Sequence, residues 1–499
     1  MVTLFESPLL HSILDALPSR VELYLVGGAV RDALLGRTSY DLDFTLADDT
    51  LRVARLLADA LGGAYYPLDA ERQYARIVLP ADVPGGAGER IKLDFATFQG
   101  GTLESDLRAR DFTINAMALD LRHPDVLIDP LGGAADLAAR RLRACTPHSL
   151  HNDPVRILRA VRQALSFELR IQPETIQQMR DAVSGLSQPS PERIRDEFFR
   201  ILDGPSPRTG IELLDRIGAL PYLLPELPGL KGVEQSAPHI YDVWTHTLEV
   251  VNRLETVLDA LAGPFNPDSA SNLMLGLVSL RLGRFRAPLQ DHLHALLNPD
   301  RSIRALLFLA ALYHDAGKPA ARQVDESGRI RFLEHDQIGE GLVEQRLRDL
   351  HLSNPEILRV RLIVRHHMRP FLLGQAGDLP TRRAVYRFFR DTAAAGVDIC
   401  ILSLADMLAT NGPAQKQADW AHHLDVVRSL LEAWWERPEE SVAPQALVDG
   451  KELMQILKLP PGPLIGRLLE EIREAQAMGQ VTTRQEALSL ARQINETLR

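Results

Sequence analysis

Residues 41–44, Asp-Leu-Asp-Phe, restrict the local fold more than any other short stretch of this chain. On an extended strand, side chains two positions apart point to the same face, so Asp41 and Asp43 share one face while Leu42 and Phe44 turn to the core. Two carboxylates then converge on one hard cation. Mg²⁺ prefers oxygen ligands and keeps substrate phosphates in its shell. The stretch therefore predicts a site for metal-assisted phosphoryl or nucleotidyl transfer.

A Gly-Gly pair precedes these aspartates. Gly27 and Gly28 follow the strand-like residues 22–26 and precede residues 29–36, which have helical spacing. Because glycine has no Cβ, the pair lets backbone N–H groups and a helix N-terminus approach a triphosphate closely. Each element alone also matches a tight turn or a polar strand end, since short motifs often occur by chance. In this order the two elements predict a single site, in which the Gly-Gly pair holds the phosphates and the aspartates hold the metal.

The hydrophobic periodicity changes once along the chain. Residues 21–145 alternate short apolar runs with turns, as strands mixed with helices do, whereas nearly every periodic stretch after residue 150 is helical. A chain of 499 residues is also too long for a single core. We therefore expect four parts, which are an α+β head over residues 1–145, an all-α neck over 146–235, a helical domain over 236–412 and a helical C-terminal region over 413–499.

Five motifs in order carry a family resemblance, and they lie at residues 25–44, 109–119, 129–137, 153–162 and 192–202. They are similar to those of class II tRNA nucleotidyltransferases and bacterial poly(A) polymerases, over about residues 20–230. The resemblance implies a polymerase β-like nucleotidyltransferase head in which Asp41 and Asp43 are catalytic and bind Mg²⁺. An RNA 3′-hydroxyl would attack the nucleotide there, and pyrophosphate would leave. The resemblance also implies that the following residues bind the nucleotide: Gly27, Gly28, Arg31, Arg110, Asp111, Asn115, Asp153, Arg156, Arg159 and Arg162.

Asp153 and Arg156 predict how a nucleobase is chosen without a template. On a helix, residues three apart share a face, where the carboxylate accepts and the guanidinium donates. Cytosine and adenine match this pair, while uracil and guanine leave buried acceptors unpaired at a cost of roughly 1–3 kcal/mol each. The alternative is structural, because Asp153 as N-cap with Pro154 at the first helical position also begins a helix well.

Two departures from the family pattern bear on the product. Asn152 stands where the family usually has Glu, so the group that would orient Arg156 by charge is an amide here. After Phe98, only residues 99–102 intervene before the next motif, whereas complete CCA-adding enzymes usually carry a longer flexible loop. Enzymes that add only the two cytidines characteristically lack that loop. Both CC addition and CCA addition therefore remain open from the sequence.

A second set of polar residues lies in the helical part of the chain, at His246, His314, Asp315, His335, His366, His367 and Asp406. A lone histidine on an apolar face is more often a core residue, but a carboxylate inside the apolar helix around Asp406 needs a partner. The order of these residues resembles the HD phosphohydrolase superfamily over about residues 236–412. It implies a divalent metal, either Mg²⁺ or a transition metal such as Mn, Fe, Ni or Zn, and hydrolysis of phosphomonoesters or cyclic phosphates.

Together these patterns predict a cytoplasmic enzyme that adds C, and A as an open alternative, to tRNA 3′ ends from CTP and ATP, with an associated HD phosphohydrolase activity. The alternatives are a poly(A) polymerase and a nucleotide phosphohydrolase or sensor with a non-polymerising head. A net charge of −10 argues against a nucleic-acid coat protein, and no DNA partner is expected. Two distant cysteines indicate a reducing compartment, and no apolar run reaches the ~18 residues of a membrane span.

Overall fold

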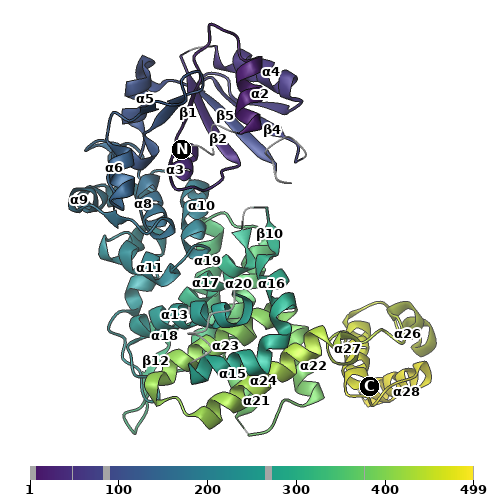
Figure 1. Ribbon diagram of the computed structural model, residues 1–499. Coiled ribbons are helices and arrows are strands. Elements are labelled where there is room, and N and C mark those ends of the chain that lie inside the picture. Colours follow the sequence, from purple (N-terminus) through teal and green to yellow (C-terminus); the bar gives the residue numbers. More distant parts are fainter. Residues whose placement is uncertain are drawn as a thin grey trace. The chain divides into compact units, whose positions relative to one another are not determined.

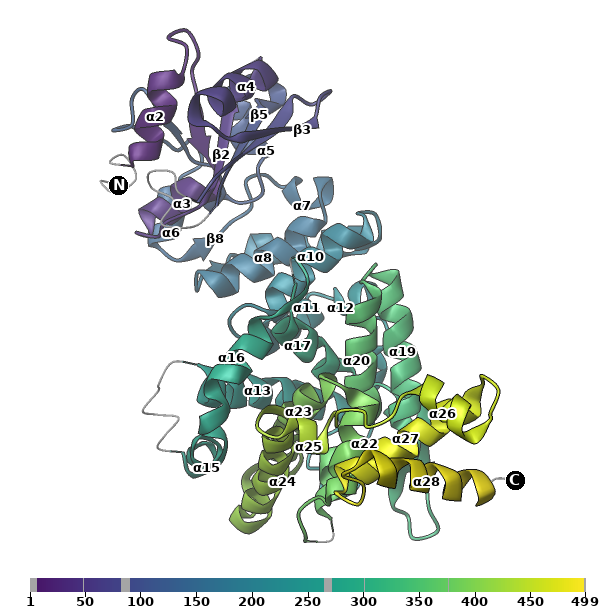
Figure 2. The ribbon, with the colours of Figure 1, turned by 90° about the vertical axis from the view of Figure 1, so that its right-hand side faces the viewer.

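The computed structural model describes residues 7–47, 49–81, 90–263, 272–299, 301–375 and 377–497. The chain divides into two compact units, of which unit 1 comprises Met1–Ser190 and Leu213–Tyr222 and unit 2 comprises Pro191–Glu212 and Leu223–Arg499. Unit 1 holds the main sheet and unit 2 is built mostly from helices (Figures 1 and 2). This confirms the predicted α+β head followed by helical domains. The four-part division expected from the sequence is finer than these two units.

The main sheet has seven strands in the order β3-β4-β5-β2-β1-β6-β7. β2 lies between β1, which is antiparallel to it, and β5, which is parallel, so β2 is an inner strand. The strands are β1 (Tyr24–Val26), β2 (Asp41–Leu46), β3 (Ala64–Asp69), β4 (Tyr74–Leu79), β5 (Ile91–Thr97), β6 (Ala118–Asp120) and β7 (Leu127–Ile128).

One face of β2 is committed to the hydrophobic core. Leu42 and Phe44 are buried, and Phe44 stacks on Phe95 of β5 with 5.1 Å between ring centroids. Helices α2 (Pro8–Ala16) and α4 (Thr50–Leu61) contribute their apolar side chains to the same core. Asp41 and Asp43 are exposed on the opposite face. The alternation along β2 thus leaves the acidic face free of the core, as its sequence pattern predicts.

The rest of unit 1 is mainly helical, and α8 carries one polar and one apolar face. Ile157, Leu158 and Val161 of α8 are buried, while Arg156 and Arg159 stay partly accessible. These elements are α3 (Gly28–Leu34), η1 (Gln99–Gly101), α5 (Leu103–Ala109), η2 (Thr113–Asn115), α6 (Gly133–Ala138), β8 (Arg141–Leu142), α7 (Ser149–Asn152), α8 (Val155–Ser166), β9 (Arg170–Ile171), α9 (Pro173–Ala182) and η3 (Val183–Ser187). Two helices contain residues at the division between the units, α11 (Pro207–Arg216) and α12 (Leu220–Leu223).

Unit 2 is organised around two strongly apolar helices, α17 (Ile303–Tyr313) and α23 (Ala395–Asn411). The stretch Ala395–Ala414 is long and apolar enough to cross a membrane by length and composition, but 78% of it is buried inside the protein. It is therefore a core helix. The preceding elements are α10 (Pro191–Leu202), η4 (Leu227–Leu230), α13 (Val243–Ala262), α15 (Leu273–Leu282), η5 (Gly283–Phe285), α16 (Arg286–His294), β10 (Leu296–Asn298) and β11 (Arg301–Ser302).

The elements between and after these two helices complete unit 2. They are α18 (Lys318–Ala321), β12 (Arg322–Val324), β13 (Ile330–Phe332), α19 (His335–Asp349), α20 (Asn354–His366), α21 (Arg369–Gly374), α22 (Arg382–Thr392), η6 (Gly412–Ala414), α24 (Gln417–Trp435), α25 (Pro438–Ser441), α26 (Gly450–Leu457), α27 (Pro463–Ala477) and α28 (Arg484–Thr497).

The last three helices, α26 to α28, share a small hydrophobic core of their own. Their contact with α22 includes a set of ion pairs at which Glu474 of α27 is buried. The Glu474 carboxylate accepts from Arg387 at 2.8 and 2.9 Å and lies 3.0 Å from Arg383 Nε. A second carboxylate, Glu470, accepts from the Tyr386 hydroxyl at 3.2 Å. The C-terminal helices are therefore attached to α22 partly through charge-assisted hydrogen bonds.

Glu474→Gln is expected to loosen this attachment. The amide loses the charge that holds two arginines, so charge-assisted hydrogen bonds are replaced by weaker neutral ones. We expect about tenfold faster hydrogen–deuterium exchange in α22 and α27, with no change in α17. The exposed Glu471 of the same helix supplies the control Glu471→Gln, which should exchange like the wild type. Equal exchange in all three proteins would show that the ion pairs do not hold α27.

Candidate functional site

The acidic face of β2 forms part of a pocket of about 340 Å³ that lies entirely within unit 1. The pocket brings together every residue that the sequence analysis assigned to the first site: Gly27, Gly28, Arg31, Asp41, Asp43, Arg110, Asp111, Asn115, Asp153, Arg156, Arg159 and Arg162. Asp32, Ser39 and Gln163 also line it, and sequence reasoning did not select them. Acidic groups from β2 and basic groups from α8 thus meet in one open pocket.

Two aspartates of β2 and one of β5 lie close together in the sheet. Asp43 is directly opposite Asp94 in the parallel register, and Asp94 is held by Arg76 at 2.7 and 2.8 Å and by the Tyr74 hydroxyl at 2.9 Å. The pKa of Asp43 is raised to about 6, first because protein atoms displace water around the carboxyl and then because Asp94 and Asp41 repel its charge, while Arg110 opposes the shift. Sequence reasoning missed Asp94, although a carboxylate inside the apolar stretch 91–95 was a visible signal.

The backbone approaches the aspartates most closely at Gly27. This residue has φ +75°, and a Cβ there would lie 3.0 Å from both Asp43 Oδ2 and Arg110 Nη1. A side chain would therefore be strained and would also crowd the groups that face the pocket. The acidic face offers only oxygen atoms as metal ligands, because Asp41 and Asp43 both have carboxylate side chains. This donor set fits a hard divalent cation beside the phosphates of a nucleotide.

A buried polar network forms the opposite wall. Asn115 donates from Nδ2 to Asp111 Oδ1 at 2.9 Å and accepts from Arg31 Nη1 at 2.6 Å. Asp111 also lies 3.1 Å from Arg159 Nε. Burial by itself would raise the pKa of Asp111, but Arg159, Asn115 and the backbone N–H of Phe112 lower it below its ordinary value. Asp111 therefore stays ionised, and Asn115, which lines the pocket although it is buried, supports its neighbours.

Asp153 and Arg156 lie in the same pocket, but they are not a simple pair on one helix. Asp153 is extended and ends α7, and α8 begins at Val155. The two side chains approach only to 3.9 Å. The Arg156 guanidinium donates to the carbonyl oxygens of Ala109 at 2.9 Å and of Arg110 at 3.1 Å. Arg156 thus ties α8 to the segment that carries Arg110, and this role was not visible in the sequence.

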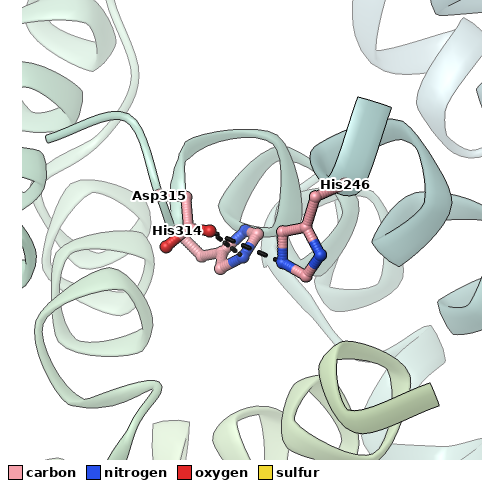
Figure 3. Close-up of side chains that lie close together, drawn as sticks. All are labelled: His246, His314 and Asp315. Carbon is pink, nitrogen blue, oxygen red and sulfur yellow. Dashed lines mark ion pairs between the residues drawn. The ribbon is translucent and has the colours of Figure 1, made fainter. Parts of the chain in front are cut away.

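Six of the seven residues in the second predicted set meet inside unit 2. His246 of α13 faces His314 and Asp315, which follow α17 (Figure 3). Asp315 Oδ2 lies 3.1 Å from His314 Nε2 and 3.5 Å from His246 Nε2, while Asp315 Oδ1 lies 3.5 Å from His335 Nε2 and 4.0 Å from His367 Nε2. Asp406 Oδ1 is 3.1 Å from His246 Nε2. Asp315 is therefore shared by two groups, each of which brings three ligand atoms within 4.8 Å of one another.

The orientation of the imidazoles fits a metal centre. In His314, His335 and His367, Nδ1 lies 2.8 Å from the carbonyl oxygen three residues earlier, at Ala311, Phe332 and Val364. A carbonyl oxygen can only accept, so Nδ1 carries the proton and Nε2 presents a lone pair to Asp315. Buried His314 Nε2 makes no hydrogen bond of normal geometry within the described ranges, while Asp315 Oδ2 has only the Lys318 ammonium at 2.6 Å as a charged partner besides the histidines. A divalent cation would satisfy these facing acceptors.

His366 belongs to neither of the two ligand groups that the described residues form. The pKa of His366 is lowered by burial and by Arg369 and Arg365, so its surroundings are those of a partly covered helix end. Two residues that sequence reasoning missed do lie beside these ligand groups. Lys318 Nζ is 2.6 Å from Asp315 Oδ2, and the His239 ring lies 5.2 Å from that of His246. Both line a cavity of about 600 Å³ that reaches Asp315, His335 and Asp406.

Four family matches cover most of the chain. Residues 23–143 match the poly A polymerase head domain, and residues 168–230 match the RNA and SrmB-binding site of polymerase A. Residues 243–411 match the HD domain, and residues 415–491 match tRNA nucleotidyltransferase domain 2. The fold and its two sites therefore define a nucleotidyltransferase head followed by an HD domain. Both domain types generally use divalent metals.

Two relatives that match nearly the whole chain identify the family more closely. The chain is 35% identical to the A-adding tRNA nucleotidyltransferase of Deinococcus radiodurans, over 93% of each chain. It is 32% identical to the CC-adding tRNA nucleotidyltransferase of Geobacter sulfurreducens, over 93% of this chain and 90% of the relative. The chain therefore belongs to the class II tRNA nucleotidyltransferase family, and the resemblance drawn from its motifs is confirmed. The fold is similar to that of the Thermotoga maritima CCA-adding enzyme complexed with tRNA, with a TM-score of 0.57 and 20% identity over 100% of this chain and 95% of that one.

Proposed function

We propose that this protein extends the 3′ end of tRNA with C from CTP, without a nucleic-acid template. The observation that carries the proposal is the pocket in which the Asp41–Asp43 pair, the Gly27 bend and the arginines of α8 converge. The names of the two relatives, which cover nearly the whole chain, support tRNA as the acceptor. The four-part organisation over residues 1–145, 146–235, 236–412 and 413–499 remains our proposal for the domains, and the family matches run in the same order.

Asp41 and Asp43 would hold Mg²⁺ in this reaction. When bound, Mg²⁺ neutralises phosphate charge and assists deprotonation of the attacking 3′-hydroxyl. The chain's own residues do the positioning. Gly27 leaves room for the phosphates beside Asp43 and Arg110, and Arg110 is held in place by Asp106 at 3.1 Å. Asp111 stays ionised beside Arg159 and would bind the nucleotide sugar. Arg162 and Arg31 add positive charge to the same wall.

CC addition is the product we favour. The segment after Phe98 is short and is held by hydrogen bonds, since Gln99 N donates to Asp106 Oδ1 at 3.0 Å and Ser105 Oγ donates to Gln99 O at 2.8 Å. Thr102 and Ser105 then form a capping box at the start of α5. This segment contains no long flexible loop of the kind usual in complete CCA-adding enzymes. Addition of A alone is the second candidate, because the Deinococcus relative at 35% identity is named A-adding.

Incubation with three tRNAs tests this assignment. One tRNA lacks its CCA end, one ends in a single C and one ends in CC, and each receives one labelled nucleotide at a time. Growth by two C residues on the first tRNA, with no A added to the third, is expected. Two C residues on the first tRNA together with A on the third would make the protein CCA-adding. Addition of A only to the tRNA that ends in CC would make it A-adding, and long A tails would make it a poly(A) polymerase. No addition to any tRNA would favour a nucleotide sensor or hydrolase.

Asp43 gives this activity an expected pH dependence. Its pKa is raised from 3.8 to about 6, so the carboxylate that binds a cation is lost as the pH falls through about 6. We expect kcat/KM for CTP to fall about tenfold per pH unit below that point. Because Mg²⁺ competes with the proton, raising Mg²⁺ should move the acid limb to lower pH. An acid limb that does not respond to Mg²⁺ would assign the titration to another group.

We further propose that the HD domain hydrolyses phosphomonoesters or cyclic phosphates with a divalent metal held by His246, His314, Asp315, His335, His367 and Asp406. His366 remains a sequence prediction that its position in the structure does not support. The facing lone pairs of His314, His335 and His367 support a metal centre, and the cavity beside it accommodates a substrate. The metal is either Mg²⁺ or a transition metal. Metal-free protein reloaded with Mg²⁺, Mn²⁺, Ni²⁺ or Zn²⁺ and assayed on a 2′,3′-cyclic nucleotide identifies it.

We also propose a cytoplasmic location. Cys145 and Cys400 are both free, and burial raises the pKa of each thiol, to about 12 for Cys145. Unpaired thiols are typical of proteins in a reducing compartment, where the tRNA acceptor is also found.

A further inference from the structure

Gln163 is a buried amide in the wall of the nucleotide pocket. It follows Arg156 by seven residues and Arg159 by four, so the three side chains lie on one face of α8. Gln163 is only 1% exposed, yet it lines the pocket. It lies one residue beyond the motif at 153–162 and has no role in the proposed reaction so far. Because a buried amide must be hydrogen-bonded, its partner indicates what it does.

The partner of Gln163 is Asn115. Gln163 Oε1 accepts from Asn115 Nδ2 at 3.0 Å, and the same Nδ2 donates to Asp111 Oδ1 at 2.9 Å. The other end of the Asn115 amide, Oδ1, accepts from Arg31 Nη1 at 2.6 Å. If the amide rotated by half a turn, its oxygen would face two acceptors and its NH₂ group would face a guanidinium. Asn115 therefore has one favourable orientation, and Gln163 supplies one of the three contacts that select it.

Arg31 and Asp111 depend on that orientation. Arg31 is fixed on its other sides by Asp32 at 2.8 Å and by the Phe167 ring, whose centroid is 4.1 Å from the guanidinium carbon. Asp111 is fixed by Arg159 and by the Phe112 N–H. Asn115 joins these two groups to each other, and its own position depends on an amide 48 residues away in the sequence. Both groups line the pocket beside the acidic face of β2.

We propose that Gln163 is a positioning residue for the incoming nucleotide. Through the Asn115 amide it holds Arg31 and Asp111 at the spacing in which they bind the nucleotide. The inference rests on the proposed function of the head, because it assumes that this pocket takes the nucleotide. Gln163 of α8 would thus set the affinity of the pocket for the nucleotide without changing the RNA-binding surface.

Gln163→Met tests the proposal, because methionine keeps the length and apolar stem of glutamine but removes the acceptor. We expect the dissociation constant for CTP, measured by equilibrium titration, to rise about five- to tenfold, as for the loss of one buried hydrogen bond. KM for CTP should rise with it. KM for tRNA and the melting temperature should match those of the wild type. The control Gln177→Met removes an exposed amide of α9 that bonds only to Asp181 among the described residues, and should change none of these values.

A double-mutant cycle with Asn115→Ala separates positioning from a direct contact. If Gln163 acts through Asn115, adding Gln163→Met to Asn115→Ala changes the CTP dissociation constant less than about twofold. Multiplied effects of the two substitutions would overturn the proposal. An unchanged dissociation constant in Gln163→Met, while the wild type binds CTP and adds C, would also overturn it and leave the proposed function intact. A wild type that binds no nucleotide would overturn both.

If Gln163→Met does not fold, Gln163→Glu replaces it in the same titration. Glutamate keeps an oxygen that accepts from Asn115 Nδ2, so the CTP dissociation constant should rise less than in Asn115→Ala, even though the added charge repels the phosphates. A rise as large as that of Asn115→Ala would contradict the proposed hydrogen bond.

Discussion

Replacing Asp43 with asparagine abolishes nucleotide addition, with kcat expected to fall by at least about a thousandfold. The amide keeps the shape of the side chain but removes the charge that binds the cation beside Gly27, where a Cβ would already lie 3.0 Å from Asp43 Oδ2. Incorporation of labelled CMP into a tRNA that lacks its CCA end measures the effect. Because surrounding protein atoms displace water from the Asp43 carboxyl and neighbouring carboxylates repel its charge, its pKa is raised, and losing the charge should not lower the melting temperature at pH 7.5 in the absence of metal.

The matched control for this variant is Asp59→Asn. Asp59 is an exposed aspartate of α4 that pairs with Arg55 at 3.3 Å, so it carries the same change of charge in the same unit. It should add nucleotides at the wild-type rate. Hydrolysis at the HD site should be the same in both variants, because that centre lies within unit 2. Retained nucleotide addition in Asp43→Asn would remove this carboxylate from the reaction and with it the metal assignment in the head.

Replacing Asp315 with asparagine has the opposite result, which is loss of hydrolysis with nucleotide addition retained. Asp315 lies between two groups of histidine nitrogens, and its pKa is held well below the ordinary value by His314 and Lys318 even though burial opposes this. Removing its charge takes a ligand atom from both groups. We expect the bound metal, measured by mass spectrometry after dialysis, to fall below about a tenth of the wild-type content.

Two further variants keep this test decisive. Asp349→Asn, at the exposed end of α19, changes the same charge and should retain both metal and hydrolysis. His367→Gln removes a ligand nitrogen and leaves the Asp315–Lys318 ion pair in place. This variant replaces Asp315→Asn in the metal measurement if Asp315→Asn destabilises unit 2. Full metal content in both Asp315→Asn and His367→Gln would show that these residues do not form a metal centre.

Local periodicity predicted those parts of the protein that depend on neighbours in the sequence. The alternation of Asp41 and Asp43 with Leu42 and Phe44 requires only that residues 41–44 form a strand with one buried face, and the structure has that arrangement. The same reasoning could have chosen between His366 and His367. Val360, Ile363 and Val364 define the buried face of α20, and His367 follows them at helical spacing, so it continues that face.

Contacts between distant segments could not be predicted in the same way. Asn115 bonds to Arg31 across 84 positions and to Gln163 across 48. Nothing in the spacing of these residues indicates that η2 will lie between α3 and α8. The Arg156 guanidinium illustrates the same limit. Its place three residues after Asp153 predicts a paired face, whereas the fold turns it toward the carbonyl oxygens of Ala109 and Arg110.

The position of β2 inside the sheet has a consequence for the evolution of this chain. Asp43 is opposite Val26 on one side and Asp94 on the other, so two neighbouring strands set its alignment. A slip of one residue would turn both carboxylates into the hydrocarbon interior and Phe44 outward. Insertions or deletions of a single residue within Asp41–Leu46 should therefore be selected against, whereas the link between Leu34 and Asp41 can change in length without moving the carboxylates.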